Sequence, residues 1–420
     1  MRFARSATLG PALVLAALVL VTALVPATPV MDALTQRAVT DATLVRPLAY
    51  VALSPICATL DALTVLSLQQ HAVVLITLVS MLIAWRIVRA RQRGTTAVHE
   101  TVAAVTFLVG WLVVYAAGAV VPRPMAALRL AHPDDVSIDF HSHTNHSWDG
   151  QRWFTAERNR AWHTRAGFDV AYVADHKSIE GALEGLASNP AQGGGATILL
   201  PALEARDHSE HVIALNVPTN VAPDHKGEWH DSTMNAADPP ILILTIPGKL
   251  ETIPQTELTG IARLVAIELS DGAPKGIGVT QRDRATILRV ARQHDLALVA
   301  GSDNHGWGST AVAWSILRIP GWRGLTPTAL DSAIQQEMRT QRGSIDRVYV
   351  RGSPDPGRSW VALALTLPAV IARELIDLSW PERVSWLCWI VAAVSIASVP
   401  SSRAARETTP RAARKNPDTA

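Results

Sequence analysis

Long uncharged apolar stretches lie toward both ends of the chain, and a more polar segment separates them. A helix needs about 20 apolar residues to cross a bilayer. Four stretches are long enough: residues 6–31, 62–85, 101–122 and 384–402. Two shorter stretches, residues 47–60 and 359–372, each contain a proline, and we interpret them as interfacial or re-entrant.

Arginine clusters predict the orientation of these spans. The first stretch follows the basic "MRFAR", as in a signal peptide, but its length and the further spans favour an uncleaved anchor. With a cytoplasmic N-terminus and four spans, "RIVRARQR" (86–93) and the arginines after residue 402 also fall inside, as the positive-inside rule requires. We therefore expect an integral protein of a bacterial cytoplasmic membrane, with its middle domain on the extracytoplasmic side.

Between residues 130 and 356, short apolar runs alternate with amphipathic stretches. Strands are predicted at "VSIDFH", "FDVAYVADH", "ATILLPALEA", "HVIALNV", "ILILTI", "LVAIELSDG" and "LALVAGSDNH". Helices are predicted at "TAERNRAWHTRAG", closed by Gly167, and at "RDRATILRVARQHD". This alternation indicates an α/β fold with a parallel sheet or barrel, in which functional residues follow the carboxyl ends of strands.

The same pattern predicts four regions. Residues 1–129 form an N-terminal membrane region with three spans, and residues 130–356 form the soluble domain. Residues 357–402 form a C-terminal membrane region with one span and a short apolar stretch. Residues 403–420 are charged and contain proline, which predicts a disordered basic tail.

The composition argues against two functions for the soluble domain, nucleic-acid binding and a cysteine-based zinc site. Hydrophobic residues make up 48% of the 420 positions and charged residues 18%, with a net charge of +2. Basic residues are not concentrated in the middle of the chain, so we expect no nucleic-acid binding. The two cysteines, Cys57 and Cys388, lie in apolar stretches and exclude a cysteine-based zinc site in the polar middle. Twelve of the fourteen histidines lie between His132 and His305.

These histidines combine with carboxylates at the ends of predicted strands. In an extended segment, His141 and His143 point to the same face because they are two residues apart. Eight residues form the candidate set: His141, His143, Asp149, His176, Glu204, His211, Asp303 and His305. Mixed imidazole and carboxylate ligands suit zinc, manganese or iron. Eight ligands exceed one tetrahedral site, which predicts two or three metal ions with a bridging carboxylate.

The ordered motifs resemble those of the PHP (polymerase and histidinol phosphatase) superfamily of metal-dependent phosphoesterases. "DFHSHTNHSWDG" is similar to its D-x-H-x-H-T-x-x-S-D-G motif, and "VAYVADHKSIEG" resembles its second, with Asp175 and His176. "LLPALEARDHSEHVIAL" is similar to the third, and "LVAGSDNHG" to the fourth. The resemblance covers roughly residues 136–318 and implies a distorted (β/α)7 barrel with two or three metal ions.

Carried over residue by residue, the resemblance divides the candidate ligands among three metals. The first would take His141, His143, Glu204 and Asp303. The second would share Glu204 and take His211. The third would take Asp149, His176 and His305.

Two departures from the family pattern affect this assignment. The first motif has an extra residue, Trp148, which puts the position of Asp149 in question. Relatives often have a histidine before a proline at the end of a middle strand, but here Ile246 precedes Pro247 and cannot bind a metal. His225 or His230 could substitute for it from the preceding loop.

The expected activity is hydrolysis of a phosphate mono- or diester by metal-activated water. The substrate would be a phosphorylated small molecule or phosphodiester, with the bilayer as a second partner. Asp303 or His305 would give a proton to the leaving group, and Arg206 or Lys177 would offset phosphate charge. Two alternatives stay open: hydrolysis of a non-phosphate ester or amide, because "AQGGGA" (191–196) lacks a phosphate-loop signature, and a metal-binding sensor without turnover.

Overall fold

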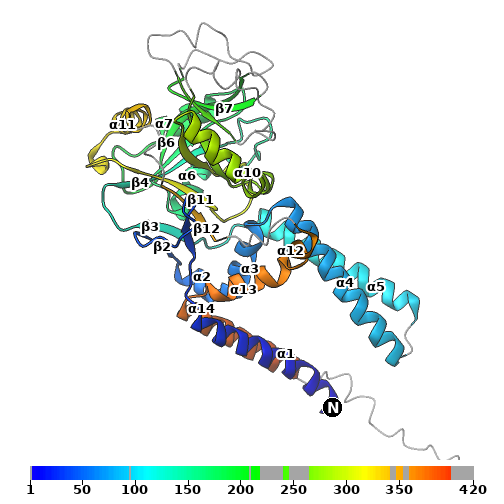
Figure 1. Cartoon of the computed structure of the whole chain (residues 1–420). Coiled ribbons are helices and arrows are strands. Elements are labelled where there is room, and N and C mark those ends of the chain that lie inside the picture. Colours follow the sequence, from blue (N-terminus) through cyan, green and yellow to red (C-terminus); the bar gives the residue numbers. More distant parts are fainter. Residues whose placement is uncertain are drawn as a thin grey trace, which may run out of the picture.

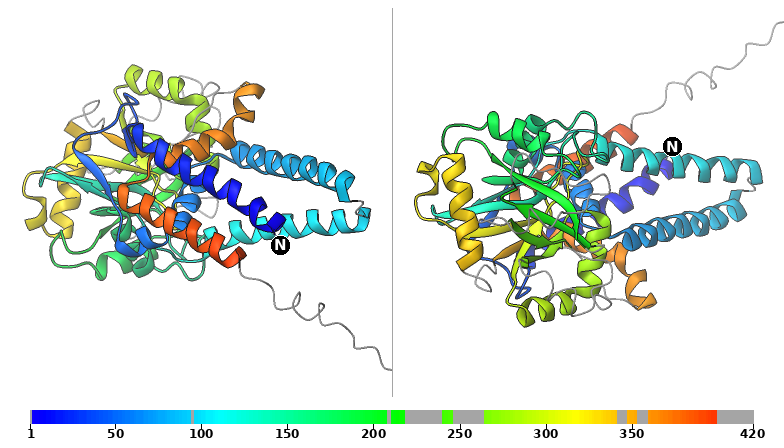
Figure 2. Two further views of the ribbon diagram at one scale, coloured as in Figure 1. Left: turned by 90° about the horizontal axis from the view of Figure 1, so that it is seen from below. Right: turned by 90° about the horizontal axis from the view of Figure 1, so that it is seen from above.

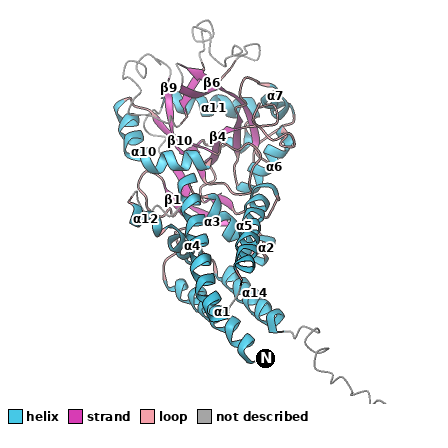
Figure 3. Ribbon diagram, turned by 90° about the vertical axis from the view of Figure 1, so that its right-hand side faces the viewer, coloured by secondary structure: helices cyan, strands magenta, loops and turns pink. Residues whose placement is uncertain are grey.

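A computed structural model of the chain describes residues 2–93, 96–207, 210–217, 240–245, 264–340, 347–352 and 359–398. The predicted tail, residues 403–420, lies outside these ranges. A domain built on a β-sheet occupies one end of the molecule, and the long helices extend from the same side of it (Figures 1 and 3).

Ten strands among the described residues form one curled sheet, an open half-barrel. In sheet order they are β1 (Val30–Asp32), β12 (Val348–Arg351), β11 (Ala313–Arg318), β4 (Asp135–Ser142), β5 (Val170–Val173), β6 (Ile198–Asp207), β7 (Glu210–Leu215), β8 (Ile241–Leu244), β9 (Leu264–Asp271) and β10 (Ala297–Gly301). The curl returns the chain after β10 to β4, where the amides of Ser302 and Asp303 donate to the His141 carbonyl at 3.1 and 2.9 Å.

The predicted α/β class is confirmed, but the sheet is mixed rather than parallel. Strands β4, β5 and β6 run parallel, as do β8, β9 and β10. Strand β7 is antiparallel to both of its neighbours, and β11 is antiparallel to β4. A parallel pair needs a crossover of a dozen or more residues, and only residues 208 and 209 separate β6 from β7. These two strands can therefore form only a hairpin.

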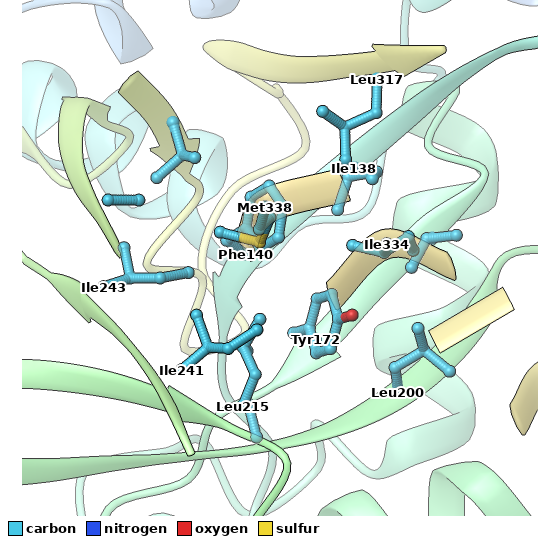
Figure 4. Packing of buried hydrophobic residues seen from close by; sticks show 14 of the residues in the cluster. Ile138, Phe140, Tyr172, Leu200, Leu215, Ile241, Ile243, Leu317, Ile334 and Met338 are labelled. Atoms are coloured by element: carbon cyan, nitrogen blue, oxygen red, sulfur yellow. The ribbon is translucent and has the colours of Figure 1, made fainter. Parts of the chain in front are cut away.

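The core fills the inside of the curl with side chains from alternate strand positions. Ile138, Phe140 and Tyr172 are fully buried, and the rings of Phe140 and Tyr172 stack with centroids 5.5 Å apart (Figure 4). Helix α11 (Pro327–Thr340) contributes Ile334 and Met338 to the same cluster. Apolar burial on this scale stabilises the sheet that positions the candidate ligands.

Helices cover the outside of the sheet: α6 (Ala156–Ala166), α7 (Glu180–Ala187) and α10 (Pro274–Gln293). The side chain of Thr155 caps the first turn of α6, and Gly167 ends it with a φ of 83°. A Cβ at Gly167 would lie 2.2 Å from the Leu128 carbonyl oxygen, so only glycine fits there. The predicted helix and its glycine stop are confirmed.

Two helices are long and apolar enough to cross a membrane: α4 (Leu68–Arg93), over residues 68–91, and α5 (Ala97–Val120), over residues 98–120. They form a hairpin whose apolar side chains face outward; Ile76 and Leu112 are each 64% exposed. Their spans agree with the second and third predicted stretches, although the second starts at Leu68 because residues 62–64 belong to another helix.

The other two predicted spans stay predictions. Helix α1 (Arg2–Val21) is followed by the short 3-10 turn η1 (Thr22–Leu24) and packs along α14 (Trp380–Ser398), as Figure 2 shows. Between the long helices and the sheet lie short ones: α2 (Leu48–Ala52), α3 (Ser54–Thr64), α12 (Trp360–Ala364) and α13 (Thr366–Ile376). At 11 residues or fewer, these are too short to cross a bilayer.

The membrane regions and the sheet share strands, which the sequence patterns do not anticipate. Strand β1, between α1 and the second membrane stretch, pairs with β12 at the sheet edge. Strand β2 (Ala42–Val45) pairs with β3 (Ala127–Leu130), which directly precedes β4. The helices are therefore joined to the domain by main-chain hydrogen bonds as well as by linkers.

A buried carboxylate on α3 fastens the helices to the sheet. Asp61, which is 4% exposed, accepts from Arg123 at 2.8 Å and from Thr310 at 2.7 Å through one oxygen. The other oxygen accepts from Arg351 at 2.8 Å and from Tyr50 at 2.9 Å. Burial raises the pKa of Asp61, but the two guanidinium groups and Thr310 lower it below its ordinary value. Asp61 is therefore ionised where helix and sheet meet.

We predict that Asp61→Asn destabilises the protein strongly, because two buried guanidinium groups lose their counter-ion. Breaking a buried ion pair from one side costs about 3 to 5 kcal/mol. Thermal unfolding of the full chain in detergent should show a clearly lower midpoint. Asp295→Asn changes an exposed carboxylate on the turn after α10 and serves as the control. Equal midpoints for the two variants would contradict the role of Asp61.

Candidate metal centre

All eight predicted ligands converge at one edge of the curled sheet. His141 lies in β4, and His143 and Asp149 lie just beyond it. His176 follows β5 and Glu204 lies within β6. The remaining three are His211 in β7 and, after β10, Asp303 and His305.

The carboxylate of Glu204 lies at the centre of the histidines. Its Oε2 is 3.1 Å from His141 Nε2 and 3.3 Å from both His143 Nε2 and His176 Nε2. Its Oε1 is 2.5 Å from His211 Nδ1. Because one carboxylate faces four imidazoles, Glu204 has the position that a bridging ligand requires.

Two aspartates close the sides of this cluster. Asp303 Oδ1 is 3.5 Å from His141 Nε2 and 3.3 Å from His143 Nε2. Asp149 Oδ1 is 3.2 Å from His305 Nε2, and its Oδ2 is 3.5 Å from His176 Nε2. Asp303 has a φ of 46°, a left-handed conformation that non-glycine residues adopt mainly at turns and functional sites.

Three overlapping groups among the described residues could each hold a metal ion. They are His143, His176 and His305; His141, His143 and Glu204; and His176, Glu204 and His211. In each group the ligand atoms lie within 4.8 Å of one another. The described residues thus include groups that are close enough to hold a metal ion, as the sequence predicted. The identity and number of the ions stay predictions.

The protonation geometry fits a cation at this edge. The Nδ1 of His305 lies 2.9 Å from the Asp303 carbonyl oxygen, to which only a protonated nitrogen can bond. A neutral His305 therefore directs a lone pair from Nε2 toward the Asp149 carboxylate, and that buried nitrogen has no hydrogen-bond partner. His141 likewise places Nδ1 3.0 Å from Glu268 and turns Nε2 toward Glu204. When a cation binds and His141 gives up its proton, the Nε2 lone pairs of both rings would be available as ligands at this edge.

The extra residue in the first motif does not displace Asp149. The turn directs Trp148 outward, where it is 76% exposed. Ser147 donates from its hydroxyl to Asp149 Oδ1 at 2.7 Å and holds the carboxylate toward the histidines. Gly150 permits the turn, because a Cβ there would lie 1.9 Å from the Thr144 carbonyl oxygen.

Two candidate ligands do not follow the carboxyl end of a strand. Glu204 lies inside β6, which continues to Asp207, and His211 lies near the start of β7 rather than at a carboxyl end. In the antiparallel β6–β7 hairpin, the start of β7 lies beside the end of β6. His211 therefore reaches the common edge from the opposite strand direction.

Three buried carboxylates beside the ligands were not assigned a role from sequence. Glu268 lies in β9, fully buried, with Oε1 3.0 Å from His141 Nδ1. Asp271 ends the same strand and accepts from the Ala273 amide at 2.7 Å. Asp175 accepts from the amide and hydroxyl of Thr144, both at 2.6 Å, and so fixes the first motif. Asp175 and Asp271 lie at the ends of predicted strands, which was the available signal, whereas Glu268 lies within its strand.

Charge at the edge is dominated by carboxylates. Burial raises the pKa of Glu204, but His141, His143 and His211 bring it well below its ordinary value. Burial lowers the pKa of His141, yet the Glu268 and Glu204 carboxylates raise it well above the ordinary value. For Asp271, burial and the nearby Asp303 and Glu268 charges raise the pKa well above normal. A bound cation would neutralise this excess of negative charge.

Other histidines near the site have different partners. His163 is fully buried, with Nε2 2.7 Å from Asp139 and Nδ1 2.8 Å from the Asn159 carbonyl oxygen. It therefore joins α6 to β4 instead of lying in solvent. His146 has Nε2 3.1 Å from Glu184 of α7 and belongs to none of the three metal-binding groups.

Several sequence predictions fall outside the described part of the chain. Arg206 lies in β6, but its side chain is not described, so its expected position beside phosphate stays a prediction. Ile246, His225 and His230 also lie outside the described residues. Lys177 follows His176, is exposed, and has a φ of 60°.

No protein-family model matches the chain, and no curated protein matches it. Among solved structures, the crystal structure of PsfC from Pseudomonas syringae PB-5123 is similar at 17% sequence identity. The match covers 57% of this chain and 98% of that one, with a TM-score of 0.36. A likeness this weak identifies neither the family nor the activity of this protein.

Proposed function

We propose that the protein is a membrane-anchored, metal-dependent phosphoesterase with a PHP-type (β/α)7 domain. The observation that carries the proposal is the convergence of His141, His143, Glu204 and Asp303 with four further motif residues at one sheet edge. These residues come from four separate motifs in the order of the superfamily. Chance histidines on a surface would not share a buried bridging carboxylate.

The chain itself would bind the metals and move protons. His141, His143 and Asp303 would hold one ion, and Glu204 would join it to a second ion beside His211. His305 and His176, with Asp149, would hold a third. Bound divalent ions would supply Lewis acidity, which activates water and offsets charge on phosphate oxygens.

Hydrolysis needs one water and one proton transfer. Water adds to phosphorus, the ester P–O bond breaks, and the departing oxygen takes a proton. The proton is the one that the attacking water loses. Asp303 and His305 line the cavity beside the site, with Oδ1 and Nδ1 3.4 Å apart, so either could pass it to the departing oxygen. Arg206 and Lys177 stay candidates for a cation beside the phosphate.

The membrane arrangement extends the proposal. The arginine cluster "RIVRARQR" ends α4, at the tip of the hairpin farthest from the sheet domain (Figure 1). The positive-inside rule then favours a cytoplasmic tip and an extracytoplasmic catalytic domain. A cysteine reporter at position 91 should label from the cytoplasmic side, and one at position 132 from outside.

We predict metal-dependent hydrolysis of an aryl phosphate by the full chain in nanodiscs supplied with Mn²⁺ or Zn²⁺. His141→Ala and Asp303→Ala should each lower the rate at least about 100-fold, since even partners of ligands cost 10- to 100-fold. His132→Ala, an exposed histidine before β4, should retain the wild-type rate. Unchanged rates in the two ligand variants would exclude this mechanism.

The same assay separates the alternatives. Turnover of a carboxylic ester or amide without turnover of a phosphate ester would favour the alternative that the protein hydrolyses non-phosphate esters or amides. Near-stoichiometric metal with no turnover on any substrate would favour a sensor. No described feature favours either alternative over the phosphoesterase.

We predict that Glu268→Gln weakens metal binding about 10- to 100-fold, because His141 would lose the carboxylate that orients its ring. Metal content after dialysis, measured by mass spectrometry, tests this without any substrate. Glu337→Gln on α11 is the matched control, because that helix carries none of the candidate ligands. Equal metal retention in both variants would show that Glu268 has no such role.

A further inference from the structure

A large cavity lies between the candidate metal centre and the membrane helices. Its volume is about 680 Å³, within the range of roughly 300 to 1,000 Å³ typical of ligand pockets. Asp149, Asp303 and His305 line one end. Helices α3, α4 and α5 line the other.

The helical end of this cavity is apolar. Leu60 and Leu63 face it from α3, Leu68 from α4 and Ala119 from α5. Three polar side chains there have partners within the helices. His71 Nδ1 and the Tyr115 phenolic oxygen are 2.9 Å apart, and the Thr64 hydroxyl donates to the Leu60 carbonyl oxygen at 2.9 Å. The wall therefore suits hydrocarbon, while the carboxylate end suits a polar group bound through metal.

The wall is continuous from the metal-binding loop to α5. The Gly308 amide donates to the Ala119 carbonyl oxygen at 2.8 Å, and Trp162 Nε1 donates to the Gly308 carbonyl oxygen at 3.2 Å. Gly308 is only three residues beyond His305. A molecule in the cavity would therefore touch the candidate site and the last residues of the α5 span at once.

The position of the cavity along the helices corresponds to the membrane surface. Leu68 begins the candidate span of α4, and Ala119 lies one residue before the end of that of α5. Exposed tryptophans lie beside the same loops: Trp307 and Trp153 are 48% and 44% exposed, with ring centroids 6.1 Å apart. Tryptophan is enriched where protein meets the bilayer interface.

We propose that this cavity receives the hydrocarbon chain of a membrane-resident phosphate ester, whose phosphate then lies at the metal centre. This rests on the proposed phosphoesterase function and names its substrate class as lipid-like. The occupant is a lipid chain because the cavity adjoins helices whose outward apolar surfaces face the bilayer. An amphiphile could enter from the interface without leaving the membrane.

Binding of alkylphosphonates, which cannot be hydrolysed, tests the cavity directly. Each methylene taken from water strengthens binding roughly four-fold when fully buried. Calorimetry on the metal-loaded full chain in nanodiscs should show decylphosphonate binding at least tenfold more tightly than butylphosphonate. Partition into empty nanodiscs is subtracted, so that bilayer affinity alone does not produce the difference.

Ala119→Phe fills the cavity from α5 and should reduce the chain-length preference at least fivefold. Thr64→Phe, from α3, should do the same. Ala116→Phe, on the exposed face of α5, is the matched control and should keep the preference. Ala116→Phe should hydrolyse phenyl phosphate at the wild-type rate, and the thermal unfolding midpoints of Ala119→Phe and Thr64→Phe report whether these two variants fold.

The outcomes separate the two proposals. Hydrolysis of phenyl phosphate with no chain-length preference would overturn the lipid assignment and leave the phosphoesterase proposal standing. A chain-length preference that Ala119→Phe and Thr64→Phe abolish, without hydrolysis of any phosphate ester, would support the cavity and overturn the phosphoesterase. If Ala116→Phe reduced the chain-length preference as much as the two cavity variants do, the preference would not arise from the cavity.

Discussion

The geometry described above depends on the buried ion cluster around Asp61. One carboxylate on α3 binds Arg123, Arg351 and Thr310, which lie on or next to three strands of the domain. Such a cluster tolerates little displacement, because any separation exposes unpaired charge to a low-dielectric interior. It thereby fixes α3 against the loop before β11. Residues of α3 and of that loop both line the 680 Å³ cavity, so this contact helps to set the cavity's shape.

A second constraint acts at the candidate metal centre, where several carboxylates lie close together. Glu204, Asp303 and Glu268 all face His141, and Asp271 lies behind them. Four acids cannot remain ionised together at such distances without a compensating positive charge. Imidazolium can supply part of it, and a divalent ion can supply more without adding protons. Stabilisation of the sheet edge and metal affinity are then linked, because binding to the folded state stabilises it.

Short motifs allowed the candidate ligands to be predicted. Glu268, the direction of β7 and the pairing of β1 were not predicted, because no short motif marks them. H-x-H and S-D-x-H place two ligands on a single turn or strand, so local spacing suffices to find His141, His143, Asp303 and His305. Glu268 follows apolar residues within one strand, and nothing local distinguishes it from a partly exposed strand residue. The β7 direction and the pairing of β1 depend on distant chain segments, which hydrophobic periodicity does not encode. Predictions of the α/β class and of α6 with its glycine stop needed only local pattern and were confirmed. The stretches predicted as the second and third spans correspond to α4 and α5, which are long and apolar enough to cross a membrane.

The pairing of β1 with β12 also orders events during synthesis. Val30 pairs with Arg351, and α1 packs along α14, so the earliest and latest segments of the described chain are neighbours. Strand β12 must present an unpaired edge to β1 only after nearly the whole domain has emerged. Until β12 has been synthesised, β1 has no partner strand in the sheet. The incomplete sheet then has an unpaired edge that could pair with another chain. The late pairing of β1 with β12 therefore lengthens the time during which the incomplete sheet could associate with another chain.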